Sequence, residues 1–186
     1  MQQNLKKNIP NLLSLFRLIV TFWLILKIVQ GNFQGLLVLF VVGCASDFLD
    51  GYLARTFKWE TSLGKILDPL ADKIFMGGMF VALTFISPIF PLWMTGLVIG
   101  RDLLIMSGVF VLWKMKRLKK INPSFVSKLN TNFQMLLVFV GLISLEYNLS
   151  SIYVKFLLFP IAFTTILSFI DYGKIGTKIL FHNERL

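Results

Sequence analysis

Six apolar segments, each about as long as a bilayer is thick, constrain the fold of this chain more than any other feature. The hydrocarbon core of a bilayer measures roughly 30 Å and takes about 20 residues of helix to cross. Segments near that length cover residues 11–29, 33–54, 63–85, 92–113, 130–146 and 151–170. The pattern predicts an all-α membrane protein built as a bundle of six transmembrane helices.

Composition supports a membrane protein and sets aside several kinds of site. Hydrophobic residues make up 56% of the 186 residues and charged residues only 15%, which is too apolar for a soluble domain of this size. The length suits a single domain over residues 1–186. With one cysteine, Cys44, and one histidine, His182, we expect neither an internal disulfide nor a zinc site. The first apolar run lacks a small-residue cleavage site, so we expect a retained helix rather than a signal peptide.

Basic residues predict the orientation of the six spans. Most of the 19 Lys and Arg residues fall in the N-terminal segment, the second-to-third and fourth-to-fifth loops, and the C-terminal tail. The loops on the other side hold only Lys27 and Lys155. Since basic residues collect on the cytoplasmic side, both termini are predicted to be cytoplasmic. The net charge of +10 indicates contact with anionic membrane lipids, and we expect no nucleic-acid partner.

Four aspartates lie at or just inside the ends of the second and third apolar segments, where charged side chains are costly. They belong to residues 47–73, which read DFLDGYLARTFKWETSLGKILDPLADK. At about 100° per residue, one helix face would carry Asp47, Asp50, Gly51 and Ala54. The next helix would carry a stripe of Gly64, Asp68 and Asp72. If the two faces meet, all four carboxylates come together.

Such a cluster predicts a metal site. Four anions in a low-dielectric site repel one another unless they are protonated or neutralised. Oxygen ligands without His or Cys indicate Mg²⁺ or Mn²⁺, and four carboxylates can bridge two ions that clamp phosphate oxygens. The small residues leave room for a ligand or for close helix approach, and Arg55 could hold a phosphate. The alternative is structural, with the acids in salt bridges to Arg55, Lys65 and Lys73.

The same segment carries a family resemblance. It fits the pattern D-x-x-D-G-x-x-A-R-x8-G-x-x-x-D-x-x-x-D at every fixed position. Those positions are Asp47, Asp50, Gly51, Ala54, Arg55, Gly64, Asp68 and Asp72. This pattern resembles the signature of the CDP-alcohol phosphatidyltransferase family. The resemblance implies a six-helix bundle, usually a homodimer, whose site opens to the cytoplasmic leaflet, with CDP-diacylglycerol and an alcohol acceptor as substrates.

The resemblance also implies a role for each signature residue. Asp47, Asp50 and Asp68 would hold two divalent metals. Asp72 would help to hold one of them and act as general base, taking the proton from the acceptor hydroxyl as CMP is expelled. The residues lying against the CDP moiety would be Gly51, Ala54, Arg55 and Gly64. Physical chemistry agrees, because three carboxylates can bridge two ions and leave an oxygen of the fourth free to accept a proton.

Two arginines inside apolar segments need partners. Arg17 ends the stretch NIPNLLSLFR, which resembles the opening of the bacterial and mitochondrial members that make phosphatidylglycerophosphate or cardiolipin. Its side chain requires a carboxylate or a bound phosphate, or else it snorkels to the membrane surface. Arg101 either pairs with its neighbour Asp102 or binds a substrate phosphate.

The region before the fifth apolar segment bears on the acceptor. Lys128 and Thr131, with Arg101, could bind an acceptor phosphate at a helix start. Otherwise they are a positive-inside lysine and a helix cap. The stretches GRDLLI and SKLNT look more like the cardiolipin synthases of the family, so phosphatidylglycerol is the expected acceptor. The alternative acceptor is glycerol 3-phosphate, which would make the enzyme a phosphatidylglycerophosphate synthase.

A rival from another class stays open on the sequence. In a divalent-cation transporter the same acids would line an ion pathway, although such a pathway does not require Arg55 or the glycines. As an enzyme, the chain would lie in a bacterial or mitochondrial inner membrane as a multi-pass protein. Its active site would face the cytoplasm or the matrix.

Overall fold

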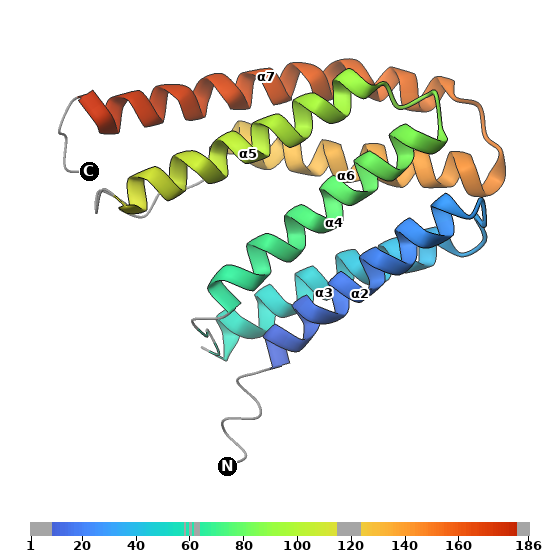
Figure 1. The fold of residues 1–186 in the computed structure, drawn as a ribbon, viewed down its shortest axis with the longest axis horizontal. Coiled ribbons are helices and arrows are strands. Elements are labelled where there is room, and N and C mark those ends of the chain that lie inside the picture. Colours follow the sequence, from blue (N-terminus) through green and yellow to red (C-terminus); the bar gives the residue numbers. More distant parts are fainter. Residues whose placement is uncertain (1–8, 58, 60, 62–63, 115–123, 182–186) are drawn as a thin grey trace, which may run out of the picture. The chain divides into compact units, whose positions relative to one another are not determined.

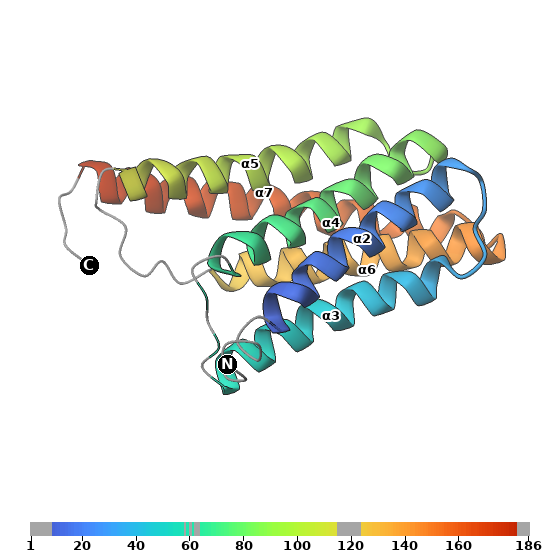
Figure 2. The same cartoon turned by 60° about the horizontal axis from the view of Figure 1, so that its bottom comes forward.

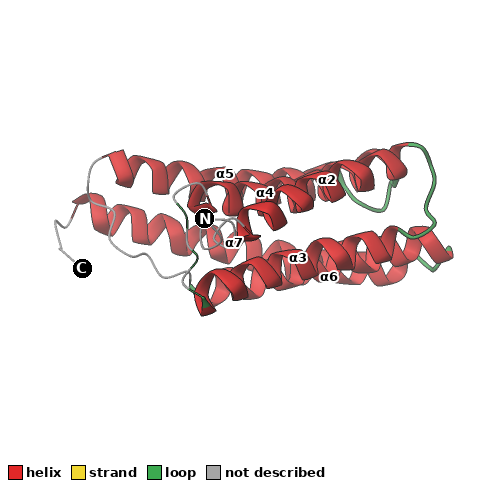
Figure 3. Ribbon diagram, turned by 90° about the horizontal axis from the view of Figure 1, so that it is seen from below, coloured by secondary structure: helices red, strands yellow, loops and turns green. Residues whose placement is uncertain are grey.

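The computed structural model describes residues 9–57, 59, 61, 64–114 and 124–181, without the side chains of residues 55, 65–66, 109, 112–113 and 175–181. Helices are the only regular elements in these residues (Figure 3). With the labels of Figure 1, they are α2 (Ile9–Val29), α3 (Leu36–Thr56), α4 (Gly64–Ile86), α5 (Leu92–Lys114), α6 (Phe125–Tyr147) and α7 (Ile152–Phe181). The chain divides into two compact units, one containing residues 1–88 and 138–150, the other residues 89–137 and 151–186.

All six predicted helices are present, which confirms the all-α fold for the described residues. The largest differences are that α6 begins at Phe125 rather than at residue 130, and that α7 continues to Phe181 rather than ending at residue 170. An apolar window detects the part of a helix that suits a membrane, whereas the helix itself continues until its backbone is interrupted. Within the described residues, every helix except α5 is long and apolar enough to span a membrane. The count of six spans, the cytoplasmic termini and the single domain stay predictions.

Many large apolar side chains face outward while several polar side chains are buried, which is unusual for a soluble protein. Phe85 and Phe159 are 81% and 82% exposed, whereas Arg17, Asn130 and Ser168 are completely buried. An apolar surface of this kind suits lipid, and polar groups inside spans find their partners within the protein. The chain is therefore a multi-pass membrane protein.

In the first unit, α2 packs against both α3 and α4 (Figures 1 and 2). Phe40 of α3 stacks on Phe75 of α4, with ring centroids 5.3 Å apart. Gly43 faces the same ring, since a Cβ at this position would lie 2.7 Å from Phe75. The small residue lets α3 and α4 approach closely. This contact lies one turn before Asp47 on α3 and one turn after Asp72 on α4, so it holds the acid-bearing turns near each other.

The start of α3 is held by a carboxylate from the end of α6. Gly31, with φ at +68°, ends α2 in a Schellman motif whose two backbone hydrogen bonds measure 3.0 and 2.9 Å. Gly35 lies four residues after Gly31, just before α3. The Glu146 carboxylate accepts hydrogen bonds from the backbone N–H groups of Gly35 (2.9 Å) and Leu37 (3.1 Å). A carboxylate suits the free donors and the positive end of a helix. Glu146 thus anchors α3 at the end opposite its aspartates.

In the second unit, α5 packs against α7, and both views of the ribbon show the two helices side by side (Figures 1 and 2). The first half of α6 joins α7 through polar contacts. Asn130 Oδ1 accepts hydrogen bonds from the hydroxyl groups of Thr164 (3.0 Å) and Thr165 (2.8 Å). Such contacts hold helices together in a membrane, where unpaired polar groups are costly.

Candidate active site

Arg17 of α2 is paired with two of the four signature aspartates. Its side chain is completely buried, with Nη1 2.8 Å from Asp47 Oδ1 and Nη2 donating a hydrogen bond to Asp50 Oδ2. Asp47 and Asp50 are three residues apart on α3, so both reach the same guanidinium. The Asp50 side chain is buried, whereas that of Asp47 is 44% exposed. The expected carboxylate partner of Arg17 is confirmed, and the alternative that its side chain snorkels to the surface is wrong.

Ser14 brings the acids of α3 and α4 to one place. Its hydroxyl lies 2.5 Å from Asp68 Oδ1 and 3.5 Å from Asp50 Oδ2. A hydroxyl group has one hydrogen to donate, and the shorter distance assigns it to Asp68. Ser14 and Arg17 are three residues apart on α2, so a single helix face touches Asp47, Asp50 and Asp68. The predicted meeting of the two acidic faces is therefore present for these three acids, with α2 joining them.

Gly64, the first residue of α4, leaves room for α2. Its N–H donates to Thr61 Oγ1 at 2.9 Å, and the Thr61 hydroxyl donates to Asn11 Oδ1 of α2, also at 2.9 Å. A Cβ at Gly64 would lie 2.7 Å from Asn11 Oδ1. The close helix approach expected of a small residue here is present between α2 and α4. On α3, Gly51 and Ala54 are half-buried.

Asp72 follows Asp68 by one turn of α4. Its Oδ2 lies 3.9 Å from Lys73 Nζ, and the two side chains are 34% and 29% exposed. Asp72 is more accessible than Asp50.

Two of the acids do form salt bridges, but with a basic residue other than those named from the sequence. Of the three basic residues named for these bridges, Lys73 has a described side chain, and its Nζ lies 3.9 Å from Asp72 Oδ2. The closest basic partner of Asp47 and Asp50 is Arg17, which the sequence does not assign to them. The side chains of Arg55 and Lys65, and the basic loop between α5 and α6, lie outside the described residues.

Sequence reasoning missed the role of α2 in this site. Asn11, Ser14 and Arg17 recur every third residue in an otherwise apolar stretch of α2, and all three contact residues of the signature segment. Residues three apart lie on one face of a helix. The spacing of these polar residues was the signal that could have located the face.

A second buried polar cluster surrounds Arg101 in the other unit. Nη1 lies 2.6 Å from Asp102 Oδ1, which confirms the pairing expected as one alternative. Nε donates to Ser168 Oγ of α7 at 3.1 Å, and Nη2 donates to Ser127 Oγ of α6. The guanidinium carbon also lies 5.7 Å from the centre of the Tyr172 ring. Every nitrogen of this guanidinium has a partner within the chain.

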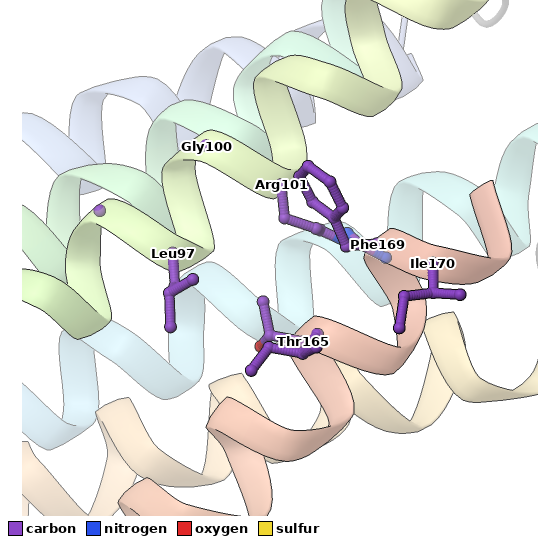
Figure 4. Close-up of a pocket in the computed structure, with 8 residues that line it drawn as sticks. Leu97, Gly100, Arg101, Thr165, Phe169 and Ile170 are labelled. Atoms are coloured by element: carbon purple, nitrogen blue, oxygen red, sulfur yellow. The ribbon is translucent and has the colours of Figure 1, made fainter. Parts of the chain in front are cut away.

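The other residues predicted to bind the acceptor lie beside this cluster. The Thr131 hydroxyl donates to the backbone carbonyl of Ser127 at 3.2 Å, and Lys128 is exposed. Arg101 also borders a largely apolar cavity of about 300 Å³ between α5 and α7, whose wall includes Leu97 and Phe169 (Figure 4). Arg101 and Thr131 thus share Ser127 as a neighbour, while Lys128 points to the surface.

The acids of the first unit have the ligand chemistry of a hard divalent cation. Asp47, Asp50 and Asp68 offer carboxylate oxygens and Ser14 a hydroxyl, and oxygen is the ligand that Mg²⁺ and Mn²⁺ prefer. In the structure, Asp47 and Asp50 are paired with the Arg17 guanidinium. Across the part of the chain that the structure describes, no three acidic, His or Cys side chains are grouped so that they could hold an ion. The chemistry of these side chains, which offer only oxygen atoms, is of the kind that binds Mg²⁺ or Mn²⁺.

Comparison with known proteins identifies the family. A family model described as CDP-alcohol phosphatidyltransferase matches residues 7–168. A CDP-diacylglycerol–glycerol-3-phosphate 3-phosphatidyltransferase of Aquifex aeolicus is 37% identical over 179 residues, which cover 94% of this chain and 98% of that protein. A protein of the same name from Haemophilus influenzae is 33% identical over 189 residues, covering 98% of this chain and 100% of that protein.

Cardiolipin synthases are similar as well. The cardiolipin synthase (CMP-forming) of Homo sapiens is 34% identical over 187 residues, which cover 91% of this chain and 62% of that protein. The chain thus spans less than two thirds of that relative. Both groups of relatives are named as phosphatidyl-transferring or CMP-forming enzymes, which excludes the cation-transporter alternative. With the family model matched over most of its length, the chain belongs to the CDP-alcohol phosphatidyltransferase family, and it is a phosphatidyltransferase.

Proposed function

We propose that this enzyme transfers the phosphatidyl group of CDP-diacylglycerol to a hydroxyl group of a glycerol-containing acceptor and releases CMP. The observation that carries the proposal is the meeting of Asp50 and Asp68 at Ser14. It brings together acids from two helices at the place where the family signature lies. The names of the Aquifex aeolicus and Haemophilus influenzae relatives, which contain glycerol 3-phosphate, support a glycerol-containing acceptor.

In the proposed site, Asp47, Asp50, Asp68 and Asp72 hold two divalent cations, Mg²⁺ or Mn²⁺. Ions bound there neutralise phosphate oxygens and orient them for an in-line displacement. Asp50 and Asp68 already lie near each other, because both have an oxygen within 3.5 Å of the Ser14 hydroxyl. Arg17 has to release Asp47 or Asp50 first, since it occupies both.

Asp72 acts as the general base in this proposal. Its partial exposure gives an acceptor hydroxyl access that the buried Asp50 does not offer. One Asp72 oxygen takes the proton while the hydroxyl oxygen bonds to the phosphorus that carries diacylglycerol. The bond from that phosphorus to the bridging oxygen breaks, and CMP leaves with the electron pair. The proton then passes from Asp72 to solvent.

The CDP moiety lies against small residues near the acids in this proposal. Gly51 and Ala54 follow Asp50 on α3, and their small side chains leave room for a nucleotide beside the helix. Arg55 supplies a cation for phosphate. Gly64 lies at the start of α4, where Asn11 and Thr61 add polar groups. Amide and hydroxyl groups of this kind suit hydrogen bonds to a nucleotide.

Glycerol 3-phosphate is the first acceptor to test. The two relatives named for this acceptor match nearly the whole chain and are themselves almost fully covered. The human cardiolipin synthase has additional length that this chain does not match. This weighs against the sequence-based expectation of phosphatidylglycerol, which stays a prediction.

Phosphatidylglycerol is the second candidate because of the surroundings of Arg101. Asp102 neutralises much of the Arg101 charge, and Lys128 is an exposed cation beside this cluster. A lipid phosphodiester carries one negative charge and needs fewer cations than the dianionic phosphate of glycerol 3-phosphate. In both versions the acceptor phosphate lies near Arg101, Lys128 and Thr131.

The setting of the enzyme completes the proposal. It forms a homodimer in a bacterial or mitochondrial inner membrane, with the active site facing the cytoplasm or the matrix. Anionic membrane lipids surround its basic loops. These statements rest on the charge distribution and on the family resemblance.

The test is a competition with the purified full-length enzyme, CDP-diacylglycerol and both acceptors at equal concentration. CMP release is followed by chromatography and the lipid products by mass spectrometry, with Asp68→Ala as the inactive control. Phosphatidylglycerophosphate as the main product supports the first candidate, and cardiolipin supports the second. Absence of CMP with either acceptor would contradict the proposed function.

A further inference from the structure

The first unit holds a cation of its own among the predicted metal ligands. Arg17 is the largest fully buried side chain in the described chain, and both of its anionic partners, Asp47 and Asp50, belong to the signature. A buried guanidinium is strongly favoured beside carboxylates, because an uncompensated charge inside a membrane protein is costly. Arg17 therefore supplies positive charge where the proposed function needs divalent ions.

The guanidinium is incompletely hydrogen-bonded in this position. Nε and Nη1 are buried without a hydrogen-bond partner, and Nη1 is held only by its 2.8 Å ion contact with Asp47. Arg101 shows what a fully satisfied guanidinium looks like in the same chain, with bonds from Nε, Nη1 and Nη2. Unpaired buried donors weaken the hold of a site on its side chain, so Arg17 is placed to be exchanged.

We propose that Arg17 is an exchangeable counter-cation of the acidic cluster. In the metal-free protein it neutralises Asp47 and Asp50 and keeps α2 against α3, and it must release at least one of these carboxylates when divalent ions bind. The inference rests on the proposed metal site. It assigns Arg17 a positioning role that competes with the metal, which neither the signature nor the family match assigns.

Charge and geometry predict the direction in which divalent-ion affinity changes when the Arg17 charge is removed. A guanidinium and a divalent ion bound to the same two carboxylates repel each other, and the repulsion is strong at a partly dehydrated site. Removing the charge of Arg17 therefore strengthens divalent-ion binding. A purely structural role predicts the opposite, because losing the contact between α2 and α3 would loosen the arrangement of the ligands.

The experiment measures Mn²⁺ binding to the full-length protein in detergent micelles by the electron paramagnetic resonance signal of free Mn²⁺. Arg17→Gln, which removes the charge but keeps amide donors, should bind Mn²⁺ about tenfold more tightly than the wild type. Lys27→Gln removes the same charge near the other end of α2 and should leave the affinity unchanged. Equal or weaker binding by Arg17→Gln overturns the inference.

Thermal unfolding gives a second readout. In excess chelator, Arg17→Gln should unfold at a temperature several degrees below the wild type, and saturating Mn²⁺ should restore most of the difference. Arg17→Lys keeps the charge, so its Mn²⁺ affinity should stay near that of the wild type even if Arg17→Gln does not fold. If Arg17→Lys binds Mn²⁺ about tenfold more tightly than the wild type, as predicted for Arg17→Gln, the charge has no role.

Failure of the inference and failure of the proposed metal site give different results. If the wild type binds Mn²⁺ and Asp68→Ala does not, the metal site stands, and the Arg17 variants alone decide the inference. If the wild type binds no Mn²⁺, the proposed metal site and the proposed exchange of Arg17 are both contradicted.

Discussion

The hydroxyl group of Ser14 lies 2.5 Å from Asp68 Oδ1, so a residue of α2 holds an acid of α4. The two residues are 54 positions apart in the chain. Asp50 of α3 lies 3.5 Å from the same hydroxyl. A residue outside the signature therefore bonds to one acid inside it and lies beside a second.

Ser14→Ala removes this link and should lower both stability and turnover. A hydrogen bond to a charged group contributes roughly 1.5–3 kcal/mol, and freeing Asp68 should reduce kcat by about tenfold or more. Ser107→Ala is the matched control, because Ser107 is exposed and bonds only within its own helix to Leu104. Thermal unfolding and CMP release check the prediction, and equal behaviour of the two variants would contradict it.

Removal of a metal ligand should abolish activity. Asp47→Ala, Asp50→Ala and Asp68→Ala should each lower turnover by several orders of magnitude, since each unbalances a shared cluster. The wild type should likewise lose CMP release in excess chelator and regain it with Mg²⁺ or Mn²⁺. Undiminished turnover in metal-free buffer would end the two-metal proposal.

Asp72→Asn separates base chemistry from metal holding. Asparagine keeps the shape and one ligand oxygen of aspartate but cannot take a proton. The variant should bind CDP-diacylglycerol while turnover falls by about a hundredfold or more. Equilibrium binding of a labelled CDP-diacylglycerol and single-turnover CMP release measure the two steps. Near-native turnover would place the base elsewhere, and lost binding would leave Asp72 with a metal-holding role only.

Lys128→Ala tests the acceptor site. Lys128 is exposed beside Ser127, which contacts Arg101, so its charge is available to an acceptor phosphate. The KM for the acceptor should rise several-fold, while that for CDP-diacylglycerol stays within about twofold. Lys155→Ala, another exposed lysine of the second unit, serves as the control. Equal changes in both KM values would place Lys128 outside the acceptor site.

Glu146→Gln tests the anchor of α3. The neutral amide can accept only one of the hydrogen bonds from Gly35 and Leu37 and loses the attraction to the helix N-terminus. We expect a loss of about 1 kcal/mol in the free energy of unfolding. Mn²⁺ affinity should change little, because Asp47 and Asp50 lie at the opposite end of α3. A thermal unfolding temperature equal to that of the wild type would show that the cap contributes nothing.

Local patterns in the sequence were enough to predict the helices and their acidic faces. Apolar length predicted the helices because backbone hydrogen bonds inside a membrane must be made within each segment. The spacing of Asp47, Asp50, Asp68 and Asp72 predicted acidic faces because the helix period is fixed, and the same residues led to the family. The charge of Arg17 in an apolar segment required an anion, although several partners remained possible.

The faces on which the helices meet became known only from their packing. Hydropathy predicts that a helix spans the membrane but not how the helix is rotated about its axis, because lipid can contact any apolar face. Only packing showed that α2 turns Asn11, Ser14 and Arg17 toward α3 and α4. Packing also gave Arg17 two carboxylates and Arg101 a complete set of internal partners. Such choices depend on side chains distant in sequence, so no local pattern contains them.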